Sequence, residues 1–326
     1  MMPTPTLLAG VPVEPGSHIV HHLHAATTHG GFDVAAQLHL LRGATPGPTL
    51  VVHAGMSGLE IEPALTLPRW LRSIDPRSLR GNLIVAPLFN LSGFEFERIE
   101  AAWDDADLNA LGAGRVDGTV SEQLIHAYAS TVLEQADAVI DLRTGAQWGY
   151  YRYAGVHDVG GSERIESSLA LAASLGLPHA ALGEPVGATL AGAMAARGIT
   201  WVTAWLGGGP GLRDHREVDS QALEHLLDGA LAHLGMSDGS PADPAPMLRI
   251  HTILRPEAQR GLTFMDTSLR GSQVSAGTEL GVVRDPFEGH VVRSVLAKRD
   301  GTVLHAGASW PVVPEGSTLA ILADPL

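Results

Sequence analysis

The sequence predicts an α/β protein in which helices flank a mostly parallel or mixed central sheet, with a small all-β domain at the C-terminal end. Three observations predict this fold. Short apolar runs rich in β-branched residues alternate with helical stretches ahead of residue 236. A Pro-, Ser- and Asp-rich stretch, MSDGSPADPAP at 236–246, has the composition of a linker. Beyond it, short β-type runs are separated by Gly, Pro and Asp-Gly turns.

The first part of the chain is expected to build the helix-flanked sheet. Residues 17–42 alternate in the manner of two strands, and the turn at 43–48 leads into the apolar run TLVVHAG at 49–55. The elements expected next are a helix at 63–74, a strand at 82–90, a helix from about Ser121 to Gln135, a strand at 136–145, helices at 167–176 and 186–198, and a strand at 200–209. In such sheets ligands bind beyond the carboxyl ends of the strands, so the site is expected there.

The second part of the chain is expected to contain strands alone. Its β-type runs are LRIHTIL, TELGVV, HVVRSVLA, TVLHAG and TLAILA, at 248–254, 278–283, 290–297, 302–307 and 318–323. We therefore expect an α/β domain over 1–240 and a β domain over 247–326, separated by the linker and with the β domain packed close to the site.

Composition and charge exclude several classes of function. The 326 residues are 45% hydrophobic and 17% charged, which suits a large core. With 21 Lys and Arg against 35 Asp and Glu, the formal charge of −14 argues against nucleic acid and anionic membranes as partners. There is no Cys, hence no disulfide or thiolate site. With no apolar run near the roughly 20 residues of a spanning helix and no leader pattern, a cytoplasmic protein is expected.

Several segments, taken in order, resemble one known family. They are AGMSGLE, LRGNLIVAPLFNLSGF, DLNALGAG, ADAVIDLRTG, TAWLGGGPG and the long stretch from GLTFMDTSLRG to LAKRDGTVL. Over about residues 17–326 the chain resembles the succinylglutamate desuccinylase/aspartoacylase family. The resemblance implies a zinc-carboxypeptidase-like α/β domain followed by a β domain, and deacylase (amide C–N hydrolase) chemistry.

The residues that carry chemistry in this family are where the sequence departs from it. The first turn of the family supplies a His and a Glu as zinc ligands, and here Ser57 stands in the His position while Glu60 is kept. The second His is replaced by Arg143, after Asp141 and Leu142. The catalytic Glu before the later glycine pair is replaced by Trp205. A substrate-binding Asn-Arg pair keeps its Asn, at 109, and has Ala in place of the Arg.

These replacements predict a site without the usual zinc, so no cofactor is expected. A catalytic zinc ion needs three protein ligands and an open position for water. Arg143 carries only hydrogen-bond donors and a permanent charge, and it would repel the metal. We expect its guanidinium to pair with Glu60 and so to replace the dication. Glu60 as a helix N-terminal carboxylate with Arg143 as a structural counter-ion is the alternative interpretation.

The favoured hypothesis is a divergent deacylase that acts on a small acyl amino acid or related anionic metabolite. In it Glu60 is the base and Arg143 the electrostatic stabiliser, and a lyase- or cyclase-type reaction started by proton abstraction is an equal variant. The residues expected to contact the substrate, a small anionic amino-acid-like molecule, are Ser57, Asn90, Arg98, Asn109, Asp141 and Trp205. A homo-oligomer is left open.

Two further hypotheses come from other classes. An inactive relative that binds a small molecule or a partner protein would also lose its zinc ligands. A metalloenzyme with a displaced site would use Glu60, His53 and either His157 or Asp141. A buried histidine that is satisfied by the core is the simpler interpretation of His53.

Overall fold

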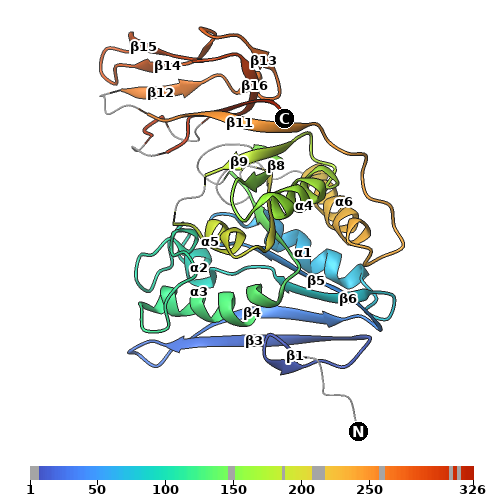
Figure 1. The fold of residues 1–326 in the computed structure, drawn as a ribbon. Coiled ribbons are helices and arrows are strands. Elements are labelled where there is room, and N and C mark those ends of the chain that lie inside the picture. The colour runs from blue at the N-terminus through green and yellow to red at the C-terminus, as the bar shows by residue number, and fades with distance from the viewer. Residues whose placement is uncertain are drawn as a thin grey trace.

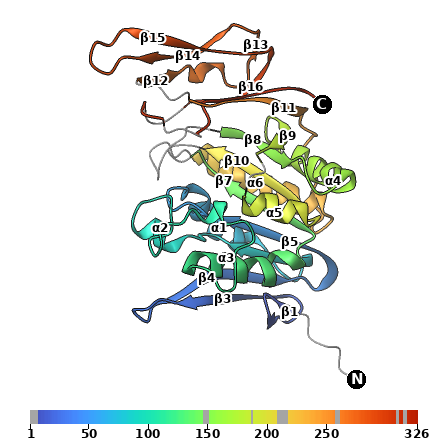
Figure 2. The same cartoon turned by 60° about the vertical axis from the view of Figure 1, so that its left-hand side comes forward.

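A computed structural model describes residues 7–145, 151–185, 188–207, 217–256, 261–307, 311–313 and 317–326. Helices cover both faces of a long twisted sheet, and the C-terminal strands lie at the opposite end of the molecule from β3 (Figures 1 and 2). The predicted fold class is confirmed. No helix in the described ranges is both long enough and apolar enough to cross a membrane.

The strands and helices of the first part follow the predicted order. The strands are β1 (Leu7–Leu8), β2 (Val11–Pro12), β3 (Ser17–Thr27), β4 (Asp33–Arg42), β5 (Thr45–Ala54), β6 (Arg80–Ala86), β7 (Ala138–Arg143), β8 (Tyr151–His157), β9 (Ala180–Glu184) and β10 (Thr200–Gly207). The helices are α1 (Glu62–Ser73), α2 (Leu91–Glu95), α3 (Val120–Thr131), α4 (Ser162–Ala173), α5 (Leu190–Ala196) and α6 (Glu217–His233), with short 3₁₀ turns at Leu108–Ala110 and Leu133–Gln135.

Strands β8 and β9 and helix α6 are among the elements that were not predicted from the sequence. Strand β8 has the mixed sequence YRYAGVH, and β9 has five residues, so neither shows a clear period of two. Helix α6 spans 17 residues and buries leucines at 223, 226 and 227. Its helical spacing is visible in the sequence between residue 207 and the linker. The predicted strand at 200–209 reaches residues 208 and 209, which lie outside the described residues.

The C-terminal part contains strands and one 3₁₀ turn among its described residues. The strands are β11 (Met247–Leu254), β12 (Leu262–Met265), β13 (Gln273–Val274), β14 (Glu279–Arg284), β15 (Val291–Leu296), β16 (Gly301–Ala306) and β17 (Ala320–Pro325), and the turn is Thr267–Leu269. Strands β12, β14 and β15 form a separate antiparallel sheet of three strands.

The main sheet continues beyond the linker into the C-terminal strands. Its twelve strands run in the order β13-β16-β17-β11-β9-β8-β10-β7-β5-β6-β4-β3. Strand β11 pairs in parallel with β9, from Met247 opposite Ala180 to Arg249 opposite Leu182. Local composition did not reveal this long-range pairing. The division into domains at 240 and 247 stays a prediction.

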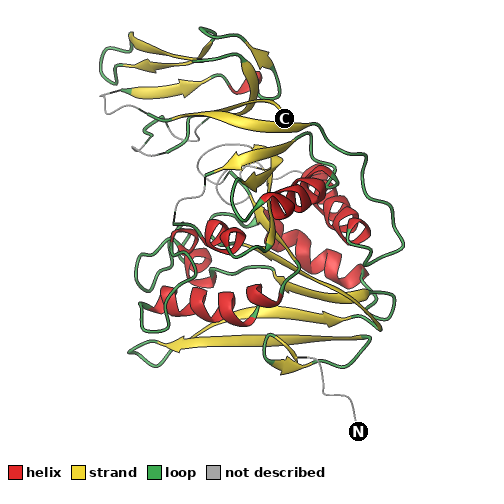
Figure 3. Ribbon diagram, in the orientation of Figure 1, coloured by secondary structure: helices red, strands yellow, loops and turns green. Residues whose placement is uncertain are grey.

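Two apolar layers hold the helices against the sheet (Figure 3). One face packs against side chains of α1, α4 and α6, among them Trp70, Leu171 and Leu227. The other packs against α3 and α5 through residues such as Tyr128 and Met194. Because successive side chains of a strand point to opposite faces, alternate residues of the central strands fall on the face covered by α3 and α5.

Candidate functional site

A cavity of about 180 Å³ lies where the central strands end, on the face covered by α3 and α5. Register brings its polar residues together, because His53 of β5 and Thr203 of β10 both stand opposite Asp141 of β7. The lining residues are His53, Met56, Asn109, Asp141, Arg143, His157, Glu184, Pro185, Thr189, Leu190, Ala191, Trp201, Thr203 and Trp205.

Arg143, the last residue of β7, is the centre of charge in this cavity. Its Nε lies 3.2 Å from Oε2 of Glu60, and its Nη1 lies 3.9 Å from Oδ1 of Asp141. The same guanidinium donates a hydrogen bond to the side-chain oxygen of Asn109 and lies 5.5 Å from the ring centre of Trp205. The expected contact between Glu60 and Arg143 is therefore present, and the side chain of Arg143 is 14% exposed.

Glu60 lies behind Arg143 and does not line the cavity. It follows the turn after β5, in which Gly55 has a φ of +67° that favours glycine. The residue is buried, and burial raises the pKa of its carboxyl to about 7 although Arg143 acts in the opposite direction. A carboxyl with this pKa accepts and releases a proton near neutral pH.

Asp141 is the carboxylate that the site keeps charged. Burial acts to raise its pKa, but Arg143 and a hydrogen bond from His53 outweigh burial and lower it. The Nε2 of His53 lies 3.2 Å from Oδ1 of Asp141, and its Nδ1 lies 3.1 Å from the hydroxyl of Tyr128. His53 is thus a buried histidine with each ring nitrogen within 3.2 Å of a polar group of the core.

Glu184, the last residue of β9, is a site residue that the sequence did not reveal. The β8–β9 register shifts between Val156 and His157, so that His157 stands opposite Glu184. The extra residue is Gly183, whose φ of +110° is open to glycine, and this bulge turns Glu184 to the face of the cavity. Burial raises the pKa of Glu184 to about 7.

His157, at the end of β8, also lines the cavity. The residue is buried, and burial lowers the pKa of its imidazole. It is therefore neutral at neutral pH.

Three residues expected to contact the substrate lie elsewhere. Ser57 is buried in the turn, where its Oγ accepts a hydrogen bond from the backbone of Leu59. Asn90 is the N-cap of α2, and its side chain accepts from the backbone N–H of Gly93 at 2.8 Å. Arg98 forms ion pairs outside the cavity, the nearer one with Asp105 at 2.6 Å. Asn109, Asp141 and Trp205 do line the cavity, as expected.

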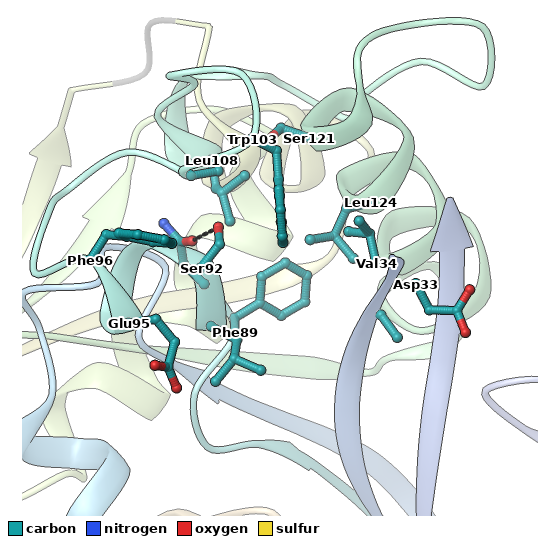
Figure 4. Close-up of a pocket in the computed structure, with 14 residues that line it drawn as sticks. Asp33, Val34, Phe89, Ser92, Glu95, Phe96, Trp103, Leu108, Ser121 and Leu124 are labelled. Carbon is teal, nitrogen blue, oxygen red and sulfur yellow. Dashed lines mark hydrogen bonds between the residues drawn. The ribbon is translucent and has the colours of Figure 1, made fainter. Parts of the chain in front are cut away.

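A second cavity, also of about 180 Å³, lies between β4, α2 and α3 (Figure 4). Phe89, Trp103, Leu108 and Leu124 point into it, and the hydroxyl of Ser92 donates to the side-chain oxygen of Asn90 at its edge. Its lining is mostly apolar, and the carboxylates of Asp33 and Glu95 are its charged groups among the described residues. It lacks the paired charges of the cavity at the strand ends.

The residues at the family's zinc positions do not fit a zinc ion. Glu60 is already paired with a guanidinium, Ser57 offers one hydroxyl, and Arg143 has no lone pair to donate. A displaced site built on His53 is also disfavoured, because its Nδ1 is hydrogen-bonded to Tyr128 and its Nε2 lies 3.2 Å from Asp141. Within the described ranges no three His, Asp or Glu side chains are arranged to hold a metal ion.

Comparison with known proteins identifies the family. The model of the succinylglutamate desuccinylase/aspartoacylase catalytic domain matches residues 46–234. The chain belongs to this family. It is 26% identical over 289 residues to an N-alpha-acetyl-L-2,4-diaminobutyric acid deacetylase of Halomonas elongata, covering 85% of this chain and 82% of that protein.

Solved structures of the family share the fold. A succinylglutamate desuccinylase/aspartoacylase from Rhodobacter sphaeroides has a TM-score of 0.83 at 20% identity, covering 95% of this chain and 96% of that one. The product-bound ectoine utilization protein EutE (DoeB) from Ruegeria pomeroyi also has a TM-score of 0.83, at 22% identity and 98% coverage of both chains. The chain is thus a member of a deacylase family with the full family fold.

Proposed function

We propose that this protein hydrolyses the amide bond of a small acyl amino acid without zinc. The observation that carries the proposal is the pair of Glu60 and Arg143, 3.2 Å apart at the family's metal position, with the guanidinium lining the cavity. Arg143 would stabilise the negative charge that forms on the acyl oxygen when water attacks. Glu60, with a pKa of about 7, would accept the proton of that water and return it to the amine nitrogen as the C–N bond breaks.

The substrate class follows from the family and from the polarity of the cavity. The similar Halomonas elongata protein is named for removing an acetyl group from a diamino acid. Arg143 offers charge-assisted hydrogen bonds to a carboxylate or an acyl oxygen, and Asn109 and Thr189 add polar groups to the same lining. We therefore place an acyl amino acid in the cavity at the strand ends.

Turnover and metal content test this proposal together. The purified protein is incubated with N-acetyl-L-2,4-diaminobutyrate and a panel of other acyl amino acids, and the released amine is measured. We expect turnover with less than one equivalent of transition metal, and a melting temperature that a chelator leaves unchanged. Stoichiometric zinc bound at Glu60 would overturn the zinc-free mechanism.

One observation favours a second candidate, an inactive relative that binds a small molecule. Glu60 does not line the cavity, and Trp205 occupies the position of the family's catalytic Glu. The binder predicts no turnover with any acyl amino acid, together with measurable binding of amino-acid-sized ligands. For an active enzyme, Glu60→Gln should abolish turnover and leave binding measurable.

A further inference from the structure

The cavity at the strand ends carries more negative than positive groups. Asp141 and Glu184 line it and Glu60 lies directly behind it, whereas Arg143 is the one permanent cation among its described lining residues. Arg143 is engaged, since Glu60 and Asp141 both lie within 4 Å of its guanidinium. No ion pair within 4 Å joins Glu184 to a described residue, and Arg143 lowers its pKa through a longer-range charge effect.

The backbone is built to place Glu184 at this position. The bulge at Gly183 turns its side chain to the cavity face. Gly155 of β8 then leaves room for it, because a Cβ at 155 would lie 2.4 Å from both Cγ and Oε1 of Glu184. Two glycines on adjacent strands thus allow one carboxylate to reach the cavity wall.

The carboxylate of Glu184 is buried, and one of its two oxygens lacks a hydrogen-bond donor. Hydrogen-bonding groups of Tyr153 and Trp205 favour its charged form. Its Oε1 nevertheless is buried and accepts no hydrogen bond from the part of the chain that the structure describes. A buried carboxylate oxygen without a donor is costly, and a ligand that supplies both a donor and a positive charge removes that cost.

We propose that Glu184 binds a primary ammonium group of the ligand, with Arg143 binding an anionic or acyl oxygen at the other end of the same molecule. This inference rests on the proposed function in taking the cavity to be the ligand site. It deepens that function, because the substrate becomes an acyl amino acid that keeps one free amino group. An ammonium has three donors and one charge, which suits a buried carboxylate whose Oε1 accepts no hydrogen bond from a described residue.

Proton release should accompany binding. Glu184 must lose its proton to pair with an ammonium, and its pKa of about 7 places that loss near neutral pH. The titratable and charged groups that face it are Tyr153, His157, Asp141 and Arg143. Of these, His157 has a lowered pKa and is already neutral at pH 7. Affinity for an ammonium ligand should therefore rise between pH 6 and pH 8.

A matched series of ligands tests the inference without turnover. 4-Aminobutyrate, pentanoate and glutarate have chains of equal length that end in ammonium, methyl and carboxylate, and none contains an amide bond. Calorimetry of the wild-type protein at pH 8 should show 4-aminobutyrate binding roughly 10-fold or more tightly than pentanoate, with glutarate the weakest. Glu184→Gln should reduce the first ratio to about one.

A control variant separates this site from a general effect of charge. Glu95→Gln removes the same charge from the second cavity and should leave the ratio unchanged. The wild-type protein alone gives a second readout, since the ratio should fall as the pH is lowered from 8 to 6. Equal binding of 4-aminobutyrate and pentanoate, no binding of either, or an unchanged ratio in Glu184→Gln would overturn the inference. The proposed function fails separately, if no acyl amino acid is hydrolysed.

Discussion

The turn at residues 55–60 and the end of β9 each bury one glutamate, and the two glutamates differ in what surrounds them. Burial raises the pKa of both Glu60 and Glu184 to about 7. Glu60 has a guanidinium 3.2 Å away and is not among the residues that line the cavity, whereas Glu184 lines the cavity and has no ion pair with a described residue. Equal proton affinity therefore does not imply equal roles, because the first carboxylate holds Arg143 and the second faces the ligand space.

Removing Arg143 should have the largest effect and should act on the turn at 55–60. Arg143→Met leaves Glu60 and Asp141 buried without their cation, which is expected to cost about 3–5 kcal/mol of the free energy of unfolding at pH 8. Urea unfolding of the wild type and of Arg143→Met measures this free energy. The double variant with Glu60→Gln should cost less than the sum of the single variants. Additive costs would show that Glu60 and Arg143 do not stabilise each other.

Removing the charge of Glu184 should act on the pH dependence of stability. A carboxyl whose pKa is raised from 4.5 to about 7 on folding stabilises the protein fully below pH 4.5 and loses that contribution as the pH rises through 7. The amide of Glu184→Gln does not titrate, so this variant does not lose stability in this way. Relative to wild type, the free energy of unfolding of Glu184→Gln should increase by about 2–3 kcal/mol between pH 5 and pH 8. Urea unfolding at both pH values measures it, and a constant difference would show that Glu184 is not buried with a raised pKa.

Gly155 should matter at the end of β9 and not at the turn. Gly155→Ala places a Cβ against Glu184 and should lower the free energy of unfolding by about 1–3 kcal/mol, because a side chain must shift. It should also weaken the preference for 4-aminobutyrate over pentanoate. An unchanged ligand preference together with unchanged stability would show that Glu184 does not depend on this glycine.

Asn90 should have the smallest effect, confined to the turn at 55–60. Its backbone N–H donates to the carbonyl of Gly55 at 2.8 Å, and its side chain caps α2. Asn90→Ala should therefore cost about 1 kcal/mol in stability, the usual value of a lost N-cap. Ligand preference at Glu184 should be unaffected. A loss of ligand binding without loss of stability would support the contact with substrate that the sequence suggested.

These contrasts also show why one glutamate was predicted and the other was not. Glu60 follows β5 and Arg143 ends β7, two apolar strands that the sequence marks clearly, and parallel neighbours end at the same edge of a sheet. Glu184 depends on a five-residue strand, on a bulge that reverses the side-chain face, and on a glycine of another strand. No local period in the sequence carries that information.

The misplaced residues have a related cause. Asn90 lies shortly after the end of β6 and Arg98 lies beyond helix α2, and short-range contacts hold both side chains away from the cavity. Likewise, the strand runs after residue 246 were identified correctly, while their continuation of the main sheet was not. Pairing between β11 and β9 joins residues about 67 positions apart, and local composition does not report such contacts.

The pairing of β11 with β9 has a consequence for the order in which the molecule is assembled. Strand β9 has β8 on one side and β11 on the other, and a Cβ at Gly183 would lie 3.3 Å from Ile250 of β11. During synthesis the N-terminal strands leave the ribosome first, and β9 remains an open edge until residues 247–254 follow. The wall of the cavity that carries Glu184 is therefore completed late, when about three quarters of the chain has already been made.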